Sequence, residues 1–315
     1  MSQTPAPIES GERRLGAGGN GLEDTVTTKW AIDVPLRLRQ RVNKSIRGAI
    51  GLTRDPPTRC NDPDEAYFAV DGVARVIHAD LPPMLIGGLA SLFIQMLHPH
   101  TMAGVADHSR YREDPLGRLR QTADFIGFTT FGSRAEAFAS IERVLAVHQA
   151  VRGTADDGAT YFANDPHLLA WVHAAETSMF LTGYRRYGRQ RLSAAQADRY
   201  VGEMAHLARD MGMVDPPETV AELNAAILTF RPELRLSSEG AVARDFVARG
   251  VVRGAKQRTI YWLLVRSSYG LMTPWQRELL GVTLSPLRLR LLIHPATKVL
   301  CWTLRLFVPP PPSAT

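Results

Sequence analysis

The sequence predicts an all-α protein in which roughly ten helices pack mainly as one large domain. Three observations favour this fold class. Apolar residues recur at helical spacing in one segment after another. Ser, Thr or Asp precedes most of these segments, often with proline in the first turn or glycine beyond the last. No segment shows the alternation of apolar and polar residues between turn signals that is typical of strands.

The composition is that of an ordinary globular chain. Of its 315 residues, 45% are hydrophobic and 22% are charged, which suits one large domain or two small ones. The two cysteines, Cys60 and Cys301, stand far apart, which excludes a disulfide framework and a cysteine-based zinc site. The net charge of +6 is spread along the chain without a concentrated basic face, so we expect no nucleic-acid partner.

The apolar segments predict neither a secretory signal nor a membrane span. The N-terminus lacks a basic region followed by an apolar core. The longest uncharged run, Leu81 to Leu97, is short for a spanning helix and contains two prolines and two glycines. We expect it to be a buried core helix. The expected location is the cytoplasm, and association with a membrane surface is left open.

Composition divides the chain into three parts. Residues 1–28 are rich in Gly, Pro, Ser and Thr without apolar periodicity, which predicts a disordered tail. Residues 29–290 carry the helical domain. Residues 291–315 form a C-terminal amphipathic segment and a proline-rich tail, in which arginines alternate with bulky apolar residues. This segment either lies in a membrane interface or packs on the domain with its arginine stems extended, and the sequence leaves both open.

The first well-marked helix follows Asp80. Prolines occupy its first turn, where the missing backbone N–H costs nothing. Its small residues, Gly87 and Gly88 among them, would let another helix or a flat ligand approach closely. We therefore expect a close contact at this helix, and the sequence leaves open which of the two makes it.

The next helix places an arginine and a threonine on the same side. Asp114 followed by Pro115 predicts its start, and it extends to about Phe131. Arg118 and Thr122 lie four residues apart, so their side chains are neighbours on the helix surface.

A third helix carries a histidine at an apolar position. Ser133 and Glu136 have capping-box spacing, and Gly153 is expected just past the C-terminus. His148 falls on the apolar stripe, where a leucine would be expected. It is either a core histidine with both ring nitrogens hydrogen-bonded or a metal ligand, since neutral imidazole is the commonest protein metal ligand. The helix alone favours the core histidine.

A fourth helix carries a second histidine of this kind. Asp165 followed by proline marks its start. One of its faces carries residues spaced at i, i+4, i+7 and i+11, namely Leu169, His173, Glu176 and Phe180. Two buried histidines on consecutive helices, His148 and His173, could face the same cavity.

Three kinds of metal site compete for these residues. A di-iron bundle needs two Glu-x-x-His pairs, and only Glu203 and His206 form one. A mononuclear zinc or iron site has no His-Glu-x-x-His spacing to support it. A haem needs one axial histidine, a flat apolar slot and basic residues for its propionates, and the chain offers all three. The residues alone leave haem as one option.

Three runs together resemble a known family. They are HPHTMAGVADHSRYREDPLGRLRQTADF, ERVLAVHQAVRG and YFANDPHLLAWVHAAE, in this order. They are similar to the catalytic domain shared by rubber oxygenase (latex-clearing protein) and the MpaB-type oxygenases, over about residues 70 to 290. The resemblance implies an all-helical domain that binds haem b, with His148 as the proximal iron ligand. Arg118 and Thr122 match the Arg-x-x-x-Thr motif needed for haem binding or activity, and His173 matches a recurrent histidine.

The chain also departs from the rubber-cleaving members. Gln121 stands where they have a lysine that can cap the distal iron position. No glutamate matches their cavity base, and Asp107 and His108 are the nearest substitutes. The rubber oxygenases act outside the cell, so polyisoprene is not the expected substrate. A smaller apolar or terpenoid-like molecule is, in a pocket lined by residues such as Phe125, Phe180 and Met179.

The sequence thus leads to one function and one rival. The first is a haem-b-dependent oxygenase that takes dioxygen and a small apolar substrate. The rival is a non-catalytic helical protein that binds haem or lipid at a membrane surface through the C-terminal segment. Turnover with oxygen and a reductant separates the two.

Overall fold

The computed structural model describes residues 35, 37, 40–41, 59–250 and 254–308, all of which belong to one unit. In chain order, its elements are α2 (Val73–His78), α3 (Leu81–Gln95), α4 (Pro99–His108), α5 (Pro115–Phe131), α6 (Arg134–Ala150), β1 (Arg152–Thr154), β2 (Thr160–Phe162), α7 (Pro166–Tyr187), α8 (Ala194–Asp210), α9 (Val220–Thr229), α10 (Ser238–Arg249), α11 (Ala255–Tyr269), α12 (Pro274–Leu279), α13 (Pro286–Arg288), the π-helical η1 (Leu289–Ile293) and α14 (His294–Phe307). The all-α prediction is confirmed. The predicted tail of residues 1–28 lies outside the described residues.

The expected caps begin the expected helices. Asp114 accepts a hydrogen bond from the Gly117 amide at 2.9 Å and starts α5. Ser133 and Glu136 form a complete capping box at the start of α6, and the same device starts α8, α9 and α12. These caps satisfy backbone donors that a helix leaves unpaired, so they fix where each helix begins.

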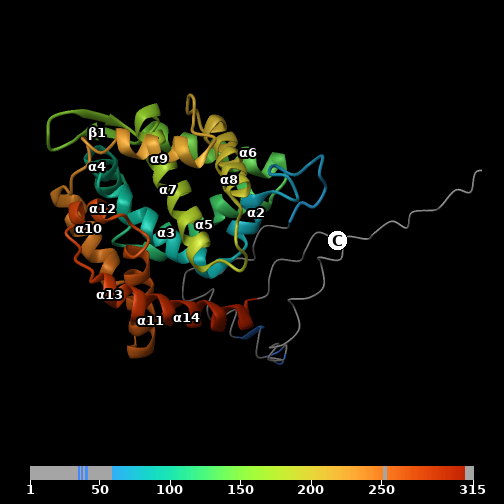
Figure 1. Cartoon of the computed structure of the whole chain (residues 1–315). Coiled ribbons are helices and arrows are strands. Elements are labelled where there is room, and N and C mark those ends of the chain that lie inside the picture. The colour runs from blue at the N-terminus through green and yellow to red at the C-terminus, as the bar shows by residue number, and fades with distance from the viewer. Residues whose placement is uncertain (1–34, 36, 38–39, 42–58, 251–253, 309–315) are drawn as a thin grey trace, which may run out of the picture. The chain divides into compact units, whose positions relative to one another are not determined.

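α3 and α7 form the central pair of the fold (Figure 1). Their backbones approach most closely at two glycines. A Cβ added to Gly87 would lie 2.8 Å from the carbonyl oxygen of Met179, and one added to Gly183 would lie 2.9 Å from that of Pro83. The expected close contact of the first helix is confirmed at Gly87, since any side chain there would force the helices apart.

Two hydrophobic clusters lie on different sides of α7. One contains Trp171 and Met179 and joins α7 to α3 and α11. The other contains Phe180 and Tyr184 and joins α7 to α2 and α8. α7 therefore separates two cores, and its residues divide between them by helical periodicity.

A small antiparallel hairpin is the one departure from the all-α prediction in the described part of the chain. β1 and β2 pair Gly153 with Tyr161. Gly153 does not end α6, which stops at Ala150; it makes room for Tyr161, whose hydroxyl would lie 2.5 Å from an added Cβ. The short strands lack a repeating alternation, which is why the sequence pattern did not reveal them.

The C-terminal segment contacts the helical domain through polar groups. Arg305 on α14 binds the buried carboxylate of Asp80 through two nitrogens, at 2.6 and 3.0 Å. Thr297 and Ser267 share a buried hydrogen bond, and His294 bonds the Tyr187 hydroxyl. One side of α14 thus packs on the domain. The domain boundary at residue 290 stays a prediction.

In the part of the chain described here, no single helix is long and apolar enough to cross a membrane. The pair α3 and α4 meets the criteria of length and composition together, but it bends by 104°. α3 is buried in the core, as the sequence predicted, with Ile86, Phe93 and Ile94 fully covered.

Candidate functional site

The predicted site residues come from three helices. Arg118 and Thr122 lie on α5, His148 on α6 and His173 on α7. Within the described residues, α5 and α6 pack against one another, but neither packs closely along α7. The α5 residues from 122 to 128 are accordingly only half-buried. Apolar side chains of α6, such as Ile141, still share a hydrophobic cluster with Phe180 of α7.

Arg118 links the two sides of this region electrostatically. Its side chain has exposed surface, yet desolvation by burial lowers the pKa of its guanidinium, opposed by the charge of Glu176. The same guanidinium lowers the pKa of His148. Arg118 therefore acts on both the α6 and the α7 residues of the site.

His148 is held as a neutral imidazole with one nitrogen inside the protein. Burial first, and then the charge of Arg118, lower its pKa, while the side chain of Asn164 opposes them. Its Nδ1 is fully buried without a hydrogen bond of good geometry, and so is the Oδ1 of Asn164. Asn164 is itself tied to α6 by a 3.4 Å bond from Nδ2 to the Leu145 carbonyl. An Nδ1–H directed at Asn164 would leave the Nε2 lone pair free to bind a metal.

His173 and Glu176 lie three residues apart on one face of α7. Desolvation lowers the pKa of His173 to about 4, and its buried Nε2 has no hydrogen-bond partner. Burial raises the pKa of Glu176 to about 7, against the opposing charge of Arg118. The face thus carries a neutral imidazole and a carboxyl group that titrates near neutral pH.

His78 on α2 shows what a satisfied core histidine looks like in this protein. Its Nδ1 lies 2.7 Å from the Thr130 hydroxyl, and its Nε2 lies 3.1 Å from the Tyr200 hydroxyl. Burial lowers its pKa to about 3, so it too is neutral. Both nitrogens of His78 are paired, whereas His148 and His173 each keep a buried nitrogen unpaired. That contrast separates a structural histidine from two ligand candidates.

Two residues of the site were not singled out from the sequence. Glu176 was placed on the His173 face but given no role, although an acidic residue on an apolar stripe was a usable signal. Asn164 lies in the turn between β2 and α7, and nothing in its local sequence marked it. Its closeness to His148 depends on how the hairpin folds back.

The structure also gives the contacts of the residues expected near the distal side of the site. Asp107 accepts a 2.5 Å bond from the Tyr161 hydroxyl, and His108 contacts the Arg152 carbonyl at 3.1 Å. Both expected substitutes for the base therefore have partners at the hairpin. Thr122 donates to the Arg118 carbonyl at 3.2 Å, and Gln121 is exposed.

The residues expected to line an apolar pocket belong to two different hydrophobic clusters. Phe125 packs on the cluster that contains Phe180, but Met179 belongs to the cluster on the α3 side of α7. Met179 thus lies in a different cluster from the other two, because adjacent helix positions point about 100° apart, and the lining of a substrate pocket stays a prediction.

The residues of the Glu-x-x-His pair make contacts within the fold. Glu203 accepts bonds from the Val73 and Ala74 amides and caps α2, and it also pairs with Arg199. His206 lies near Asp210 at 3.7 Å.

Comparison with known proteins decides the family. Residues 75–306 match the family model described as "ER-bound oxygenase mpaB/B'/Rubber oxygenase, catalytic domain". The chain belongs to this family. The mpaB/rubber oxygenase catalytic domain therefore covers α2 to α14 almost completely, including all the site residues described above. No curated protein and no solved structure matches the chain. The family assignment supports an oxygenase, and hence an enzyme of the oxidoreductase class.

Proposed function

We propose that this oxygenase-family domain binds haem b between the α5–α6 pair and α7 and oxygenates a small apolar or terpenoid-like substrate with dioxygen. The observation that carries the proposal is the buried Nε2 of His173, which lacks a hydrogen bond, together with a neutral His148 whose Nδ1 adjoins Asn164, so that its Nε2 is available to a ligand. A buried polar atom without a partner is costly, so it calls for a ligand. The proposal places the haem between these helices because the α5–α6 pair does not pack closely along α7.

The residues present fit this cofactor in distinct roles. His148 would bind the iron through Nε2, with Asn164 fixing the ring through Nδ1. Arg118, desolvated and electropositive, suits the anionic propionates, and Thr122 lies one turn further along the same helix. Haem, when bound, supplies the chemistry of oxygen activation, which no side chain of the cluster can provide.

Glu176 would be the proton-handling residue of the site. A carboxyl group with a pKa of about 7 can hold or release a proton near neutral pH. It replaces Asp107 and His108 in that role, because those two are engaged elsewhere. Phe125 and Phe180 on the same side of α7 would line the substrate region and exclude water.

The test is an absorption spectrum of the purified full chain from haem-replete cells, oxidised and then reduced. The proposal expects a Soret band of a b-type haem and consumption of oxygen with a reductant and an apolar substrate. Folded, helical protein that contains no iron and takes up no added haemin would refute it.

A second candidate rests on the exposed surface of the C-terminal segment. Large apolar side chains lie open to solvent along η1 and α14, namely Leu291, Leu292, Val299 and Trp302. Exposed basic residues, among them Arg290 and Lys298, lie between them. This pattern favours a helical haem- or lipid-binding protein at a membrane surface. Haem content without turnover, together with sedimentation on anionic vesicles, would favour this candidate over the oxygenase.

A further inference from the structure

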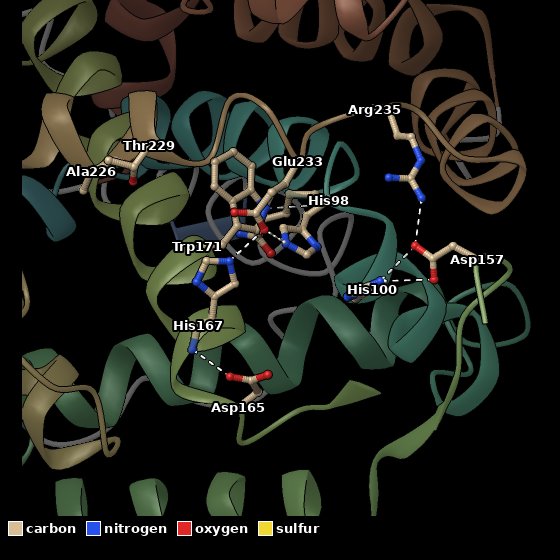
Figure 2. A network of polar contacts seen from close by, with 11 residues as sticks. His98, His100, Asp157, Asp165, His167, Trp171, Ala226, Thr229, Glu233 and Arg235 are labelled. Carbon is tan, nitrogen blue, oxygen red and sulfur yellow. Dashed lines mark hydrogen bonds and ion pairs between the residues drawn. The ribbon is translucent and has the colours of Figure 1, made fainter. Parts of the chain in front are cut away.

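A second histidine cluster lies where three distant segments meet, and Figure 2 shows it from close by. His98 stands directly before α4, His167 in the first turn of α7, and Glu233 in the loop after α9. The Nε2 of His167 lies 2.7 Å from Glu233 Oε2, and the Nε2 of His98 lies 3.4 Å from the same oxygen. One nitrogen or oxygen from each residue lies within 4.8 Å of the other two. We call these three residues the His98 cluster.

His98 is the unexplained member of the cluster. The residue is 2% exposed, yet neither ring nitrogen makes a hydrogen bond of good geometry. The rings of Trp171 and Phe230 lie beside it, so no water-filled surface satisfies it from behind. A buried imidazole directed at a carboxylate without bonding to it leaves a free energy cost that a bound cation would remove.

The spacing matches a metal site. With metal–nitrogen and metal–oxygen bonds near 2.0–2.1 Å, tetrahedral ligand atoms lie about 3.3–3.5 Å apart. The separation between His98 and Glu233 already has this value. The contact between His167 and Glu233 would have to open by about half an ångström. Both of these side chains are about half exposed, so they can make this adjustment.

We propose that His98, His167 and Glu233 bind a divalent transition-metal ion, with zinc as the best match. Two imidazoles and one carboxylate suit zinc and its first-row neighbours, whereas calcium and magnesium prefer oxygen ligands. Three protein ligands leave one position of a tetrahedral ion open, and the exposed sides of His167 and Glu233 direct that position to solvent.

Electrostatics around the cluster agree with this assignment. Burial is the largest cause that lowers the pKa of His98, so its imidazole is neutral and able to coordinate. Partial burial acts to raise the pKa of Glu233, but the hydrogen bond and the charge of His167 outweigh it, so the pKa of this carboxylate is lowered. We do not include the neighbouring His100 among the ligands, because its Nε2 already contacts Asp157 at 3.1 Å.

This site is separate from the haem region. His167 and Glu176 are nine residues apart on α7, which places them about 180° apart around the helix axis. The ion would join the α3–α4 turn, the start of α7 and the α9–α10 loop. It would therefore stabilise the folded chain in proportion to its binding, whether or not haem is bound.

The experiment uses the untagged full chain after treatment with a chelator, titrated with zinc alone in a calorimeter and melted with and without zinc. The wild type should bind one zinc per chain, and saturating zinc should raise the melting temperature by about 3–8 °C. His167→Ala and Glu233→Gln are the test variants, because both side chains are about half exposed. Each should lose at least about tenfold in zinc affinity and most of the thermal shift.

His206→Ala is the matched control, since it removes an exposed histidine that lies near a carboxylate on α8. It should keep the wild-type affinity, and the Soret band should be the same in all variants. Three outcomes would overturn the proposal. They are no zinc binding by the wild type, wild-type affinity in both test variants, and an equal loss in the control.

Discussion

The two faces of α7 differ in packing and in polarity. The face toward α3 is closed: glycines let the backbones touch, and Trp171 and Met179 are buried among apolar neighbours. The face toward α5 and α6 carries His173 and Glu176, both desolvated, with an imidazole nitrogen left unpaired. Packing of apolar groups stabilises the first face. On the second face, the missing hydrogen bond of the buried imidazole nitrogen costs free energy until that nitrogen gains a partner. Buried polar atoms without hydrogen bonds therefore indicate where a functional site lies in this fold.

The closed face should be the more sensitive to added volume. Gly87→Val would push side-chain atoms into the Met179 carbonyl and Phe180, and should lower the free energy of unfolding by about 3 kcal/mol. Urea unfolding followed by circular dichroism measures this change.

Gly88→Ala is its control on the same helix. An added Cβ there meets only a ring carbon of Phe180, at 3.6 Å. Its stability should change by less than about 1 kcal/mol, in the stabilising direction because alanine favours helix. Equal losses in the two variants would show that α3 and α7 are not packed at Gly87.

The open face should be the more sensitive to pH. Glu176 has a folded-state pKa of about 7, above its usual 4.5, so the folded chain holds a proton that the unfolded chain releases between these values. This group therefore makes the free energy of unfolding fall by roughly 3 kcal/mol as pH rises from 4.5 to 7. Buried neutral histidines such as His173 act in the opposite sense as pH falls below 6.5.

Glu176→Gln removes only the first contribution. The stability of the variant relative to the wild type should rise between pH 4.5 and 7 and stay level above pH 7. Denaturant titrations at several pH values measure the difference. A difference that is constant across this range would mean that Glu176 is an ordinary solvated carboxylate.

The α5 side of the open region should control cofactor retention. Arg118→Ala removes a desolvated positive charge, so haem should be held roughly 10- to 100-fold more weakly, while the helical content is preserved. Thr122→Ala should have a smaller effect in the same direction. Arg120→Ala, two residues along on a different side of α5, is the control for a general loss of charge. The rate at which each variant transfers haem to an apoglobin measures retention. Equal transfer rates in all three variants would mean that Arg118 and Thr122 do not contribute to haem binding.

Substitution of Asn164, which adjoins Nδ1 of His148, should have the smallest of these effects. Asn164→Ala removes the group that adjoins Nδ1, and haem affinity should fall by about tenfold because the ring loses its fixed orientation. The melting temperature of the haem-free chain should change little. An unchanged haem affinity would mean that Asn164 does not orient the imidazole.

The closed face could be predicted from the sequence, and much of the open one could not. The caps at Asp114 and Ser133 act within one helical turn, and their local spacing determines what they do. Gly87 was predicted to allow a close approach, but its partner on α7 could not be named from local spacing. The helix positions of Arg118, His148 and His173 were predicted in the same way.

Relations between distant segments escaped prediction. Asn164 reaches His148 only because the hairpin turns back, and Gly153 serves Tyr161 rather than the helix end. The raised pKa of Glu176 depends on burial by several helices, which periodicity along one helix cannot measure. The roles of His148 and His173 stay predictions.

The most direct test of the central claim compares His148→Ala with His173→Ala, read out by the absorption spectrum before and after addition of free imidazole. If His148 is the proximal ligand, its variant should lose haem or hold it loosely, and imidazole should restore a ligated spectrum by filling the space of the missing ring. His173→Ala should keep its haem. If His148→Ala instead keeps an unchanged spectrum while His173→Ala loses haem, the iron ligand is His173 and the assignment made here is wrong.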